Sequence, residues 1–131
     1  MRVLLFALVA TVLVFSTPAG ADAAGVVGTW RGESRCVLKQ SACHDEVIVY
    51  RFARGKKPNT LVASADKIVD GKALNMGELD CTVDVSGSAI ECPVPNGKGT
   101  FRYQIHGRAL SGTLTLTDGT LFRRVTATKS D

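Results

Sequence analysis

Small or apolar residues alternate with polar residues along most of the chain beyond position 27. Every second residue from Gly28 to Cys36 is small or apolar, and the residues between them are polar or charged. A period of two is what a β-strand with one buried face requires. No later stretch shows a convincing helical period, so the pattern predicts an all-β domain whose first strand covers residues 28–36.

Seven further strands are predicted, separated by residues typical of turns. We expect them at residues 46–53, 60–69, 72–85, 89–94, 101–105, 110–117 and 121–128. Asp70-Gly71 is a strong hairpin signal, Asp118-Gly119 is a second turn, and Gly77 predicts a kink or bulge in the long fourth strand. Strands joined in this way form an up-and-down meander, which loses its exposed edges when its last strand pairs with its first. We therefore predict an eight-stranded antiparallel meander closed into a small barrel, with an open sheet or a sandwich as the alternative.

The first 23 residues have the layout of a secretory signal peptide. A positive start at Arg2 precedes an uncharged, mostly aliphatic run at residues 3–15, and A-x-A sites for cleavage follow at Ala21 and Ala23. The run is shorter than the roughly 20 apolar residues that a membrane-spanning helix needs. We predict a signal peptide at residues 1–23, a barrel domain at 24–131, and a secreted or periplasmic product that does not span a membrane.

The four cysteines all lie in the part predicted to be exported, where disulfides form. A hairpin turn at Ser86-Gly87 places Cys81 directly opposite Cys92. Cys36 and Cys43 pair in the same way across a short loop. We therefore predict the disulfides Cys36–Cys43 and Cys81–Cys92, each stabilising the fold by about 2–3 kcal/mol. The hairpin also has an inward-facing row on each strand: Cys81, Val83 and Val85 on one, and Ile90, Cys92 and Val94 on the other.

Metal binding and catalysis are weakly supported by the residues present. Cys36, Cys43 and His44 could contribute to a zinc site, but structural zinc sites use more closely spaced cysteine pairs. The sequence His44-Asp45-Glu46 is the only acid–base cluster, and nothing marks a nucleophile or an oxyanion site beside it. We predict no metal, no cofactor and no enzymatic activity.

The formal net charge is +4, which favours weak attraction to anionic surfaces of the cell envelope, with solubility as the simpler explanation. The basic residues Arg51, Arg54, Lys56 and Lys57 gather around one loop. Aromatic residues do not alternate with them, as they do where bases stack in single-strand nucleic-acid sites. We expect no nucleic-acid partner.

Both ends of the domain resemble the lipocalin and fatty-acid-binding (calycin) families. The matching residues are Gly28-Thr29-Trp30 in the first strand and Arg123-Arg124 in the last. In those families the tryptophan of a G-x-W motif packs at the base of the barrel near an arginine of the final strand. The resemblance implies that Gly28, Trp30 and one of Arg123 or Arg124 close the barrel. Arg123 shares its face with Leu121 and Val125, so we expect Arg123 to lie over Trp30 in a cation–π contact.

Two further resemblances bear on function. Residues 28–32, 65–71, 76–79 and 110–124 look like a set of small secreted bacterial proteins without an assigned function. The G-x-W strand followed by a cysteine resembles small barrel-shaped bacterial inhibitors of secreted metalloproteases. The calycin resemblance implies a non-catalytic binder of a small hydrophobic ligand. The resemblance to the metalloprotease inhibitors implies instead a protein-interaction module such as a protease inhibitor.

Candidate residues for a ligand site in the lumen are the aromatic ones with inward positions. An alternative is that these side chains only fill the core of a small domain. The candidates are Trp30, Tyr50, Phe52, Phe101 and Tyr103.

Overall fold

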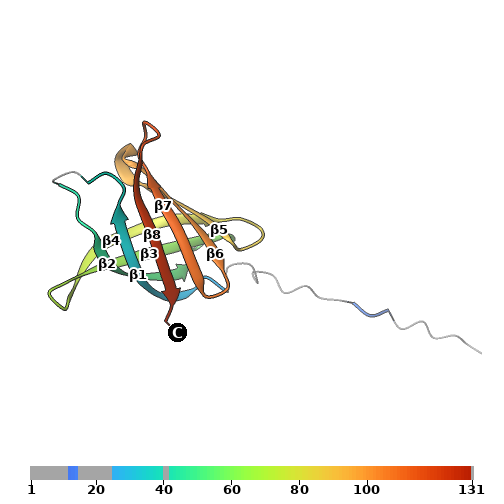
Figure 1. The fold of residues 1–131 in the computed structure, drawn as a ribbon. Coiled ribbons are helices and arrows are strands. Elements are labelled where there is room, and N and C mark those ends of the chain that lie inside the picture. The colour runs from blue at the N-terminus through green and yellow to red at the C-terminus, as the bar shows by residue number, and fades with distance from the viewer. Residues whose placement is uncertain (1–11, 15–24, 40–41, 131) are drawn as a thin grey trace, which may run out of the picture.

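The structure is a computed structural model that describes residues 12–14, 25–39 and 42–130. Eight strands follow one another in the described part of the chain, with one turn of 3₁₀ helix, η1 (Pro95–Gly97), between the fifth and the sixth (Figure 1). The strands are β1 (Gly28–Cys36), β2 (Glu46–Arg54), β3 (Thr60–Val69), β4 (Lys72–Val83), β5 (Ala89–Val94), β6 (Gly99–His106), β7 (Ala109–Thr115) and β8 (Leu121–Lys129).

Each strand pairs antiparallel with the next, and β8 pairs with β1, so the sheet forms a closed barrel. Figure 1 shows β1 and β8 side by side. Their register runs from Trp30 opposite Lys129 to Cys36 opposite Arg123. The predicted meander and the predicted pairing of the last strand with the first are both confirmed.

The alternation in the first strand predicts which residues are buried. Trp30, Ser34 and Cys36 are buried, whereas the charged residues between them are exposed. The same rule fills the barrel with one continuous hydrophobic core. Its buried members are Val26, Trp30, Ile48, Tyr50, Phe52, Leu61, Ala63, Cys81, Val83, Ile90, Cys92, Tyr103, Leu110, Val125 and Ala127.

One end of the barrel, here called the closed end, is filled by Val26 and Trp30. Both are fully buried, and the indole Nε1 of Trp30 donates a hydrogen bond to the carbonyl oxygen of Val26 at 2.8 Å. The cation beside the indole is Lys129, whose Nζ lies 6.0 Å from the ring centroid. The expected contact of Arg123 with Trp30 is wrong. Arg123 lies opposite Cys36, so at about 3.3 Å per residue the two side chains start roughly 20 Å apart along the strand.

Both predicted disulfides, Cys36–Cys43 and Cys81–Cys92, are present. The hairpin that carries the second has the predicted register, with Val83 opposite Ile90, but its connection is longer than expected. β4 ends at Val83, and the carboxylate of Asp84 accepts hydrogen bonds from backbone amides across the turn. The inward position expected for Val85 is therefore wrong: its side chain lies in the loop and is 81% exposed.

A β-bulge interrupts β4 at the predicted position. The register with β3 shifts between the pairs Ser64–Glu78 and Asp66–Asn75, so that Met76 and Gly77 together lie opposite the single residue Ala65. Gly77 has φ +99°, a conformation that favours glycine, and its amide donates to the side-chain oxygen of Asn75.

The predicted signal peptide falls almost entirely outside the described residues, as do its expected cleavage sites after Ala21 or Ala23. Among the residues that are described, no helix has the length and hydrophobicity needed to cross a bilayer.

Candidate functional site

A cavity of about 350 Å³ occupies the half of the barrel away from Trp30. It lies toward the mouth, the end at which β1 ends and β8 begins. Apolar side chains form most of its wall, and the polar groups converge at two places. The lining residues are Ser34, Glu46, Ile48, Tyr50, Ala63, Ala65, Met76, Gly77, Glu78, Leu79, Val94, Phe101, Tyr103 and Arg123.

The first of the two places where polar groups converge in the cavity is a pair of buried phenols. Tyr50 and Tyr103 meet edge to face with ring centroids 5.6 Å apart, and their hydroxyls share a hydrogen bond. Phe101 stacks on Tyr103 with centroids 5.8 Å apart. Burial raises the pKa of Tyr50, although its bond to Tyr103 and the charge of Arg123 act in the opposite direction. Burial, and then the neighbouring Tyr50, raise the pKa of Tyr103 well above its usual value.

These two phenols predict the behaviour of the fold at alkaline pH. A phenol that holds its proton more tightly in the folded state stabilises the fold fully below the unfolded pKa of about 10, and this stabilisation is lost as pH rises further. We expect phenolate absorbance and loss of β-sheet circular dichroism to appear together above that pH. Tyr103→Phe should move this transition to higher pH. Phenolate absorbance at an ordinary pKa, with the circular dichroism unchanged, would contradict the burial of the pair.

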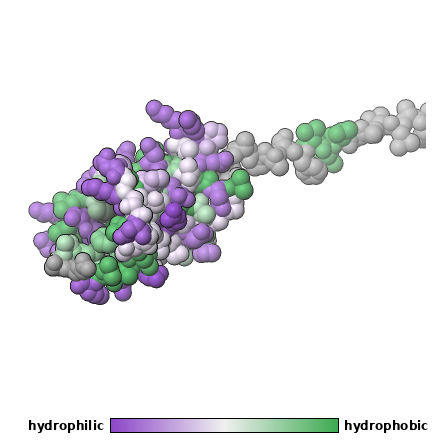
Figure 2. All heavy atoms as spheres, turned by 90° about the horizontal axis from the view of Figure 1, so that it is seen from above, coloured by the Kyte–Doolittle hydropathy of each residue, from purple (hydrophilic) through white to green (hydrophobic). Residues whose placement is uncertain are grey.

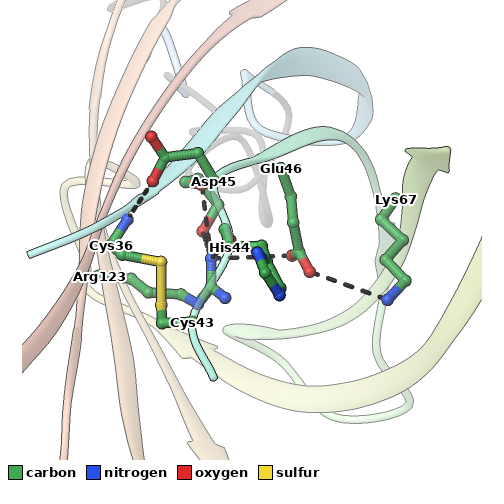
Figure 3. A network of polar contacts seen from close by, with 8 residues as sticks. Cys36, Cys43, His44, Asp45, Glu46, Lys67 and Arg123 are labelled. Carbon is green, nitrogen blue, oxygen red and sulfur yellow. Dashed lines mark hydrogen bonds and ion pairs between the residues drawn. A yellow bond between two sulfur atoms is a disulfide. The ribbon is translucent and has the colours of Figure 1, made fainter. Parts of the chain in front are cut away.

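The second polar group is a network at the mouth, centred on Arg123 (Figure 3). Its Nη1 donates to Ser34 Oγ at 3.2 Å and to the carbonyl oxygen of His44 at 3.1 Å, and lies 3.8 Å from Glu46 Oε2. Glu46 also lies 3.9 Å from the Nζ of Lys67. The network joins β8 to β1, β2 and β3, and its arginine side chain is only 14% exposed.

The disulfide-closed loop after β1 is held against this network. Asp45 accepts a hydrogen bond from the backbone amide of Cys36 at 2.7 Å, and the Cys36–Cys43 bridge closes the loop that ends next to His44 (Figure 3). His44 contributes its backbone carbonyl to Arg123. The sequence cluster His44-Asp45-Glu46 is thus used, at least in part, to build the rim of the mouth.

Three of the predicted lumen residues line the cavity, and two do not. Tyr50, Phe101 and Tyr103 reach it, whereas Trp30 and Phe52 pack in the core outside its lining. The two sets differ in their position along the barrel, because the closed end is filled by side chains and the cavity lies toward the mouth.

The sequence reasoning overlooked the rim. Glu46 and Arg123 occupy inward positions in β2 and β8, the two strands that flank β1. Once a closed barrel is assumed, opposite charges at inward positions of the two strands that flank the first strand predict an ion pair at the rim.

The described residues contain no group of three or more His, Cys, Asp or Glu side chains arranged to hold a metal ion. A larger depression, about 530 Å³, lies over β1, β7 and β8. Short side chains such as Ala109, Ser111 and Thr126 contribute to its wall, and it lacks the aromatic rings of the lumen. The lumen cavity is therefore the better candidate for a binding site.

No protein-family model and no curated protein matches the sequence. Among solved structures, the chain is similar to the crystal structure of Rv2717c from M. tuberculosis, with a TM-score of 0.53 and 18% sequence identity. The alignment covers 88% of this chain and 99% of that chain. At this level of identity the similarity establishes the closed antiparallel β-barrel fold and carries no activity from one protein to the other.

Proposed function

We propose that this protein is an exported, non-catalytic binder of a small apolar ligand, held in the lumen of the barrel. The observation that supports the proposal is the cavity of about 350 Å³, enclosed by the strands of a closed barrel. Ligand sites are mostly apolar hollows of roughly 300–1,000 Å³ with a few polar groups that orient the ligand. This volume is near the lower limit, so the ligand is small.

The lining indicates what the ligand looks like. Ile48, Ala65 and Leu79 provide an apolar wall, and the phenols of Tyr50 and Tyr103 provide hydrogen-bonding atoms. Such a site fits a compact hydrophobic molecule with few polar atoms, because every polar atom it buries needs a partner. The resemblance of Gly28-Thr29-Trp30 to the calycins supports the same class of function.

Export is part of this proposal. Two disulfides, Cys36–Cys43 and Cys81–Cys92, are compatible with a location outside the cytoplasm, where thiols are oxidised. The N-terminal signal pattern supports the same location. A secreted or periplasmic carrier or sensor would meet its ligand there.

The proposal predicts that filling the cavity abolishes binding. Ala65 lines the lumen, so Ala65→Phe should lower affinity for the uncharged fluorescent probe N-phenyl-1-naphthylamine by at least about tenfold, or about 1.4 kcal/mol. Ser64 is its neighbour on β3 and does not line the cavity, so Ser64→Phe is the matched control. Fluorescence titration gives the affinities, and native mass spectrometry of protein from an exporting host detects any co-purified molecule. Equal affinities in the two variants would exclude the lumen as the site.

A second candidate function is a protein-interaction module, such as an inhibitor of a secreted protease. The observation that favours it is the pair Val37 and Leu38, 37% and 42% exposed, on the loop closed by Cys36–Cys43. Figure 2 shows hydrophobic side chains gathered among polar ones at one end of the molecule. Inhibition assays against secreted proteases of the same source test this candidate, and a uniformly negative panel would count against it.

A further inference from the structure

We propose that the ligand reaches the lumen sideways, between β4 and β5, and that the Cys81–Cys92 disulfide sets the width of this entrance. The inference rests on the proposed function, because it concerns access to the same cavity. The entrance, called the seam below, is the gap between residues 76–80 of β4 and Val94 of β5.

The seam is the place where the barrel has the fewest backbone pairs. β4 pairs with β3 along its length, from Lys72 to Thr82. In the described chain its pairing with β5 is confined to Thr82 and Val83. Beyond that point β4 carries the bulge at Gly77, which bends a strand and disrupts its ladder. The two strands therefore separate where the cavity begins.

The exposure of the cavity lining identifies the seam, rather than the mouth, as the accessible side. At the mouth, Ser34 is buried, and Arg123 is held by hydrogen bonds to Ser34 of β1 and to the carbonyl oxygen of His44, just before β2. At the seam, Met76 is 45% exposed, and Gly77 and Glu78 are also exposed. A ligand that entered through the mouth would have to break the Arg123 network, whereas one that entered through the seam would pass between two strands that are not paired there.

The Cys81–Cys92 disulfide marks the end of the seam. It lies directly beyond the pair Thr82–Glu91, at the point where β4 and β5 cease to pair. Its Cα atoms are 4.3 Å apart, close to the roughly 4.5 Å of a non-hydrogen-bonded antiparallel pair. Without this bond, the two residue pairs of the β4–β5 ladder alone would hold the strands together, so the seam could widen into the ladder.

The first experiment narrows the seam without touching the disulfide. Met76→Trp enlarges an exposed side chain that lines the cavity. Leu74→Trp is the matched control, because Leu74 is on the same strand, equally exposed at 46%, and not in the lining. Stopped-flow fluorescence with N-phenyl-1-naphthylamine measures the association and dissociation rates.

We expect Met76→Trp to slow association by at least about threefold relative to Leu74→Trp, and to slow dissociation as well, because an obstacle in an entrance affects passage in both directions. Equal rates in Met76→Trp and Leu74→Trp would overturn the proposal. A changed Kd with an unchanged association rate would also overturn it, since Met76 would then contact the bound probe rather than guard its path.

The second experiment removes each disulfide in turn. In Cys81→Ser/Cys92→Ser we expect backbone amides of residues 82–84 and 89–92 to exchange hydrogen at least about tenfold faster, by local opening of the seam. In Cys36→Ser/Cys43→Ser, which affects the mouth loop, these amides should keep their protection. Hydrogen exchange needs no ligand, so it tests the seam independently of the proposed function. The proposed function is tested by probe binding, and it is refuted if the unmodified protein does not bind the probe. Unchanged protection in the first variant would show that the disulfide does not control the seam.

Discussion

Trp30→Ala should lower the free energy of unfolding by about 3–5 kcal/mol, the usual cost of removing a buried aromatic side chain. Trp30 is fully buried, and its side chain fills the closed end together with Val26. Its loss would leave a void at the closed end and would leave the carbonyl oxygen of Val26 without the indole donor. A domain of this size has about 5–15 kcal/mol of stability in total, so the variant should be close to unfolding.

Chemical denaturation followed by far-ultraviolet circular dichroism measures the effect, because the fluorescence of the only tryptophan is lost. Trp30→Phe is the control. It keeps most of the apolar volume and removes the donor to Val26, so its loss of stability should fall between those of the wild type and Trp30→Ala. A loss below about 1 kcal/mol in Trp30→Ala, typical of a surface change, would contradict the role given to the indole.

Gly32→Ala should also be strongly destabilising, although it adds only one methyl group. A Cβ at Gly32 would meet the backbone of β8, with Ala127 Cα at 2.6 Å and Thr126 C at 2.7 Å, and the Thr126 carbonyl oxygen closer still. A flexible side chain can relieve such a clash by changing its rotamer, but the backbone of a paired strand cannot. The change would therefore push β8 away from β1, and we expect a loss of about 3 kcal/mol, at the upper end of overpacking effects.

Thermal unfolding of Gly32→Ala and Gly25→Ala tests this expectation. Nothing lies within 4 Å of a Cβ at Gly25, so that variant should unfold at the wild-type temperature. Hydrogen exchange should show the loss of protection in Gly32→Ala along β1 and β8 first. Equal melting temperatures for the two variants would mean that the closure of the barrel tolerates a wider spacing of these strands.

The two predictions have a common cause. Trp30 and Gly32 are neighbours on the inward face of β1, one large and one without a side chain. The tryptophan fills the closed end, and the glycine allows β8 to approach. The strand that the alternation identified first is thus the one at which closure of the barrel is most sensitive to side-chain size.

Pairings between residues close in sequence could be predicted well. The Cys81–Cys92 bridge followed from counting outward from a turn, and the bulge at Gly77 followed from a single glycine in a long strand. The length of the loop after Val83 was misjudged. Asp84 offers its carboxylate to the amides of the turn, which stabilises a wider connection than Ser86-Gly87 alone suggests.

The position of Arg123 could not be predicted in the same way. The sequence identified it correctly as an inward-facing residue of the last strand, but 89 residues separate it from Ser34, whose oxygen atoms it contacts. Which residue of β8 lies opposite Trp30 depends on how far the strands are staggered around the whole barrel. That stagger accumulates over eight pairings and two register shifts, so no local pattern contains it.

The amino-acid sequence by itself determined the strands, the order in which they pair and the two disulfides, because alternation and turn residues act over a few positions. Only the tertiary structure decided that Lys129 rather than Arg123 lies beside Trp30, and that the cavity is confined to the mouth end. These features depend on the register at which the last strand meets the first, and on how side chains from all eight strands fill the space they enclose.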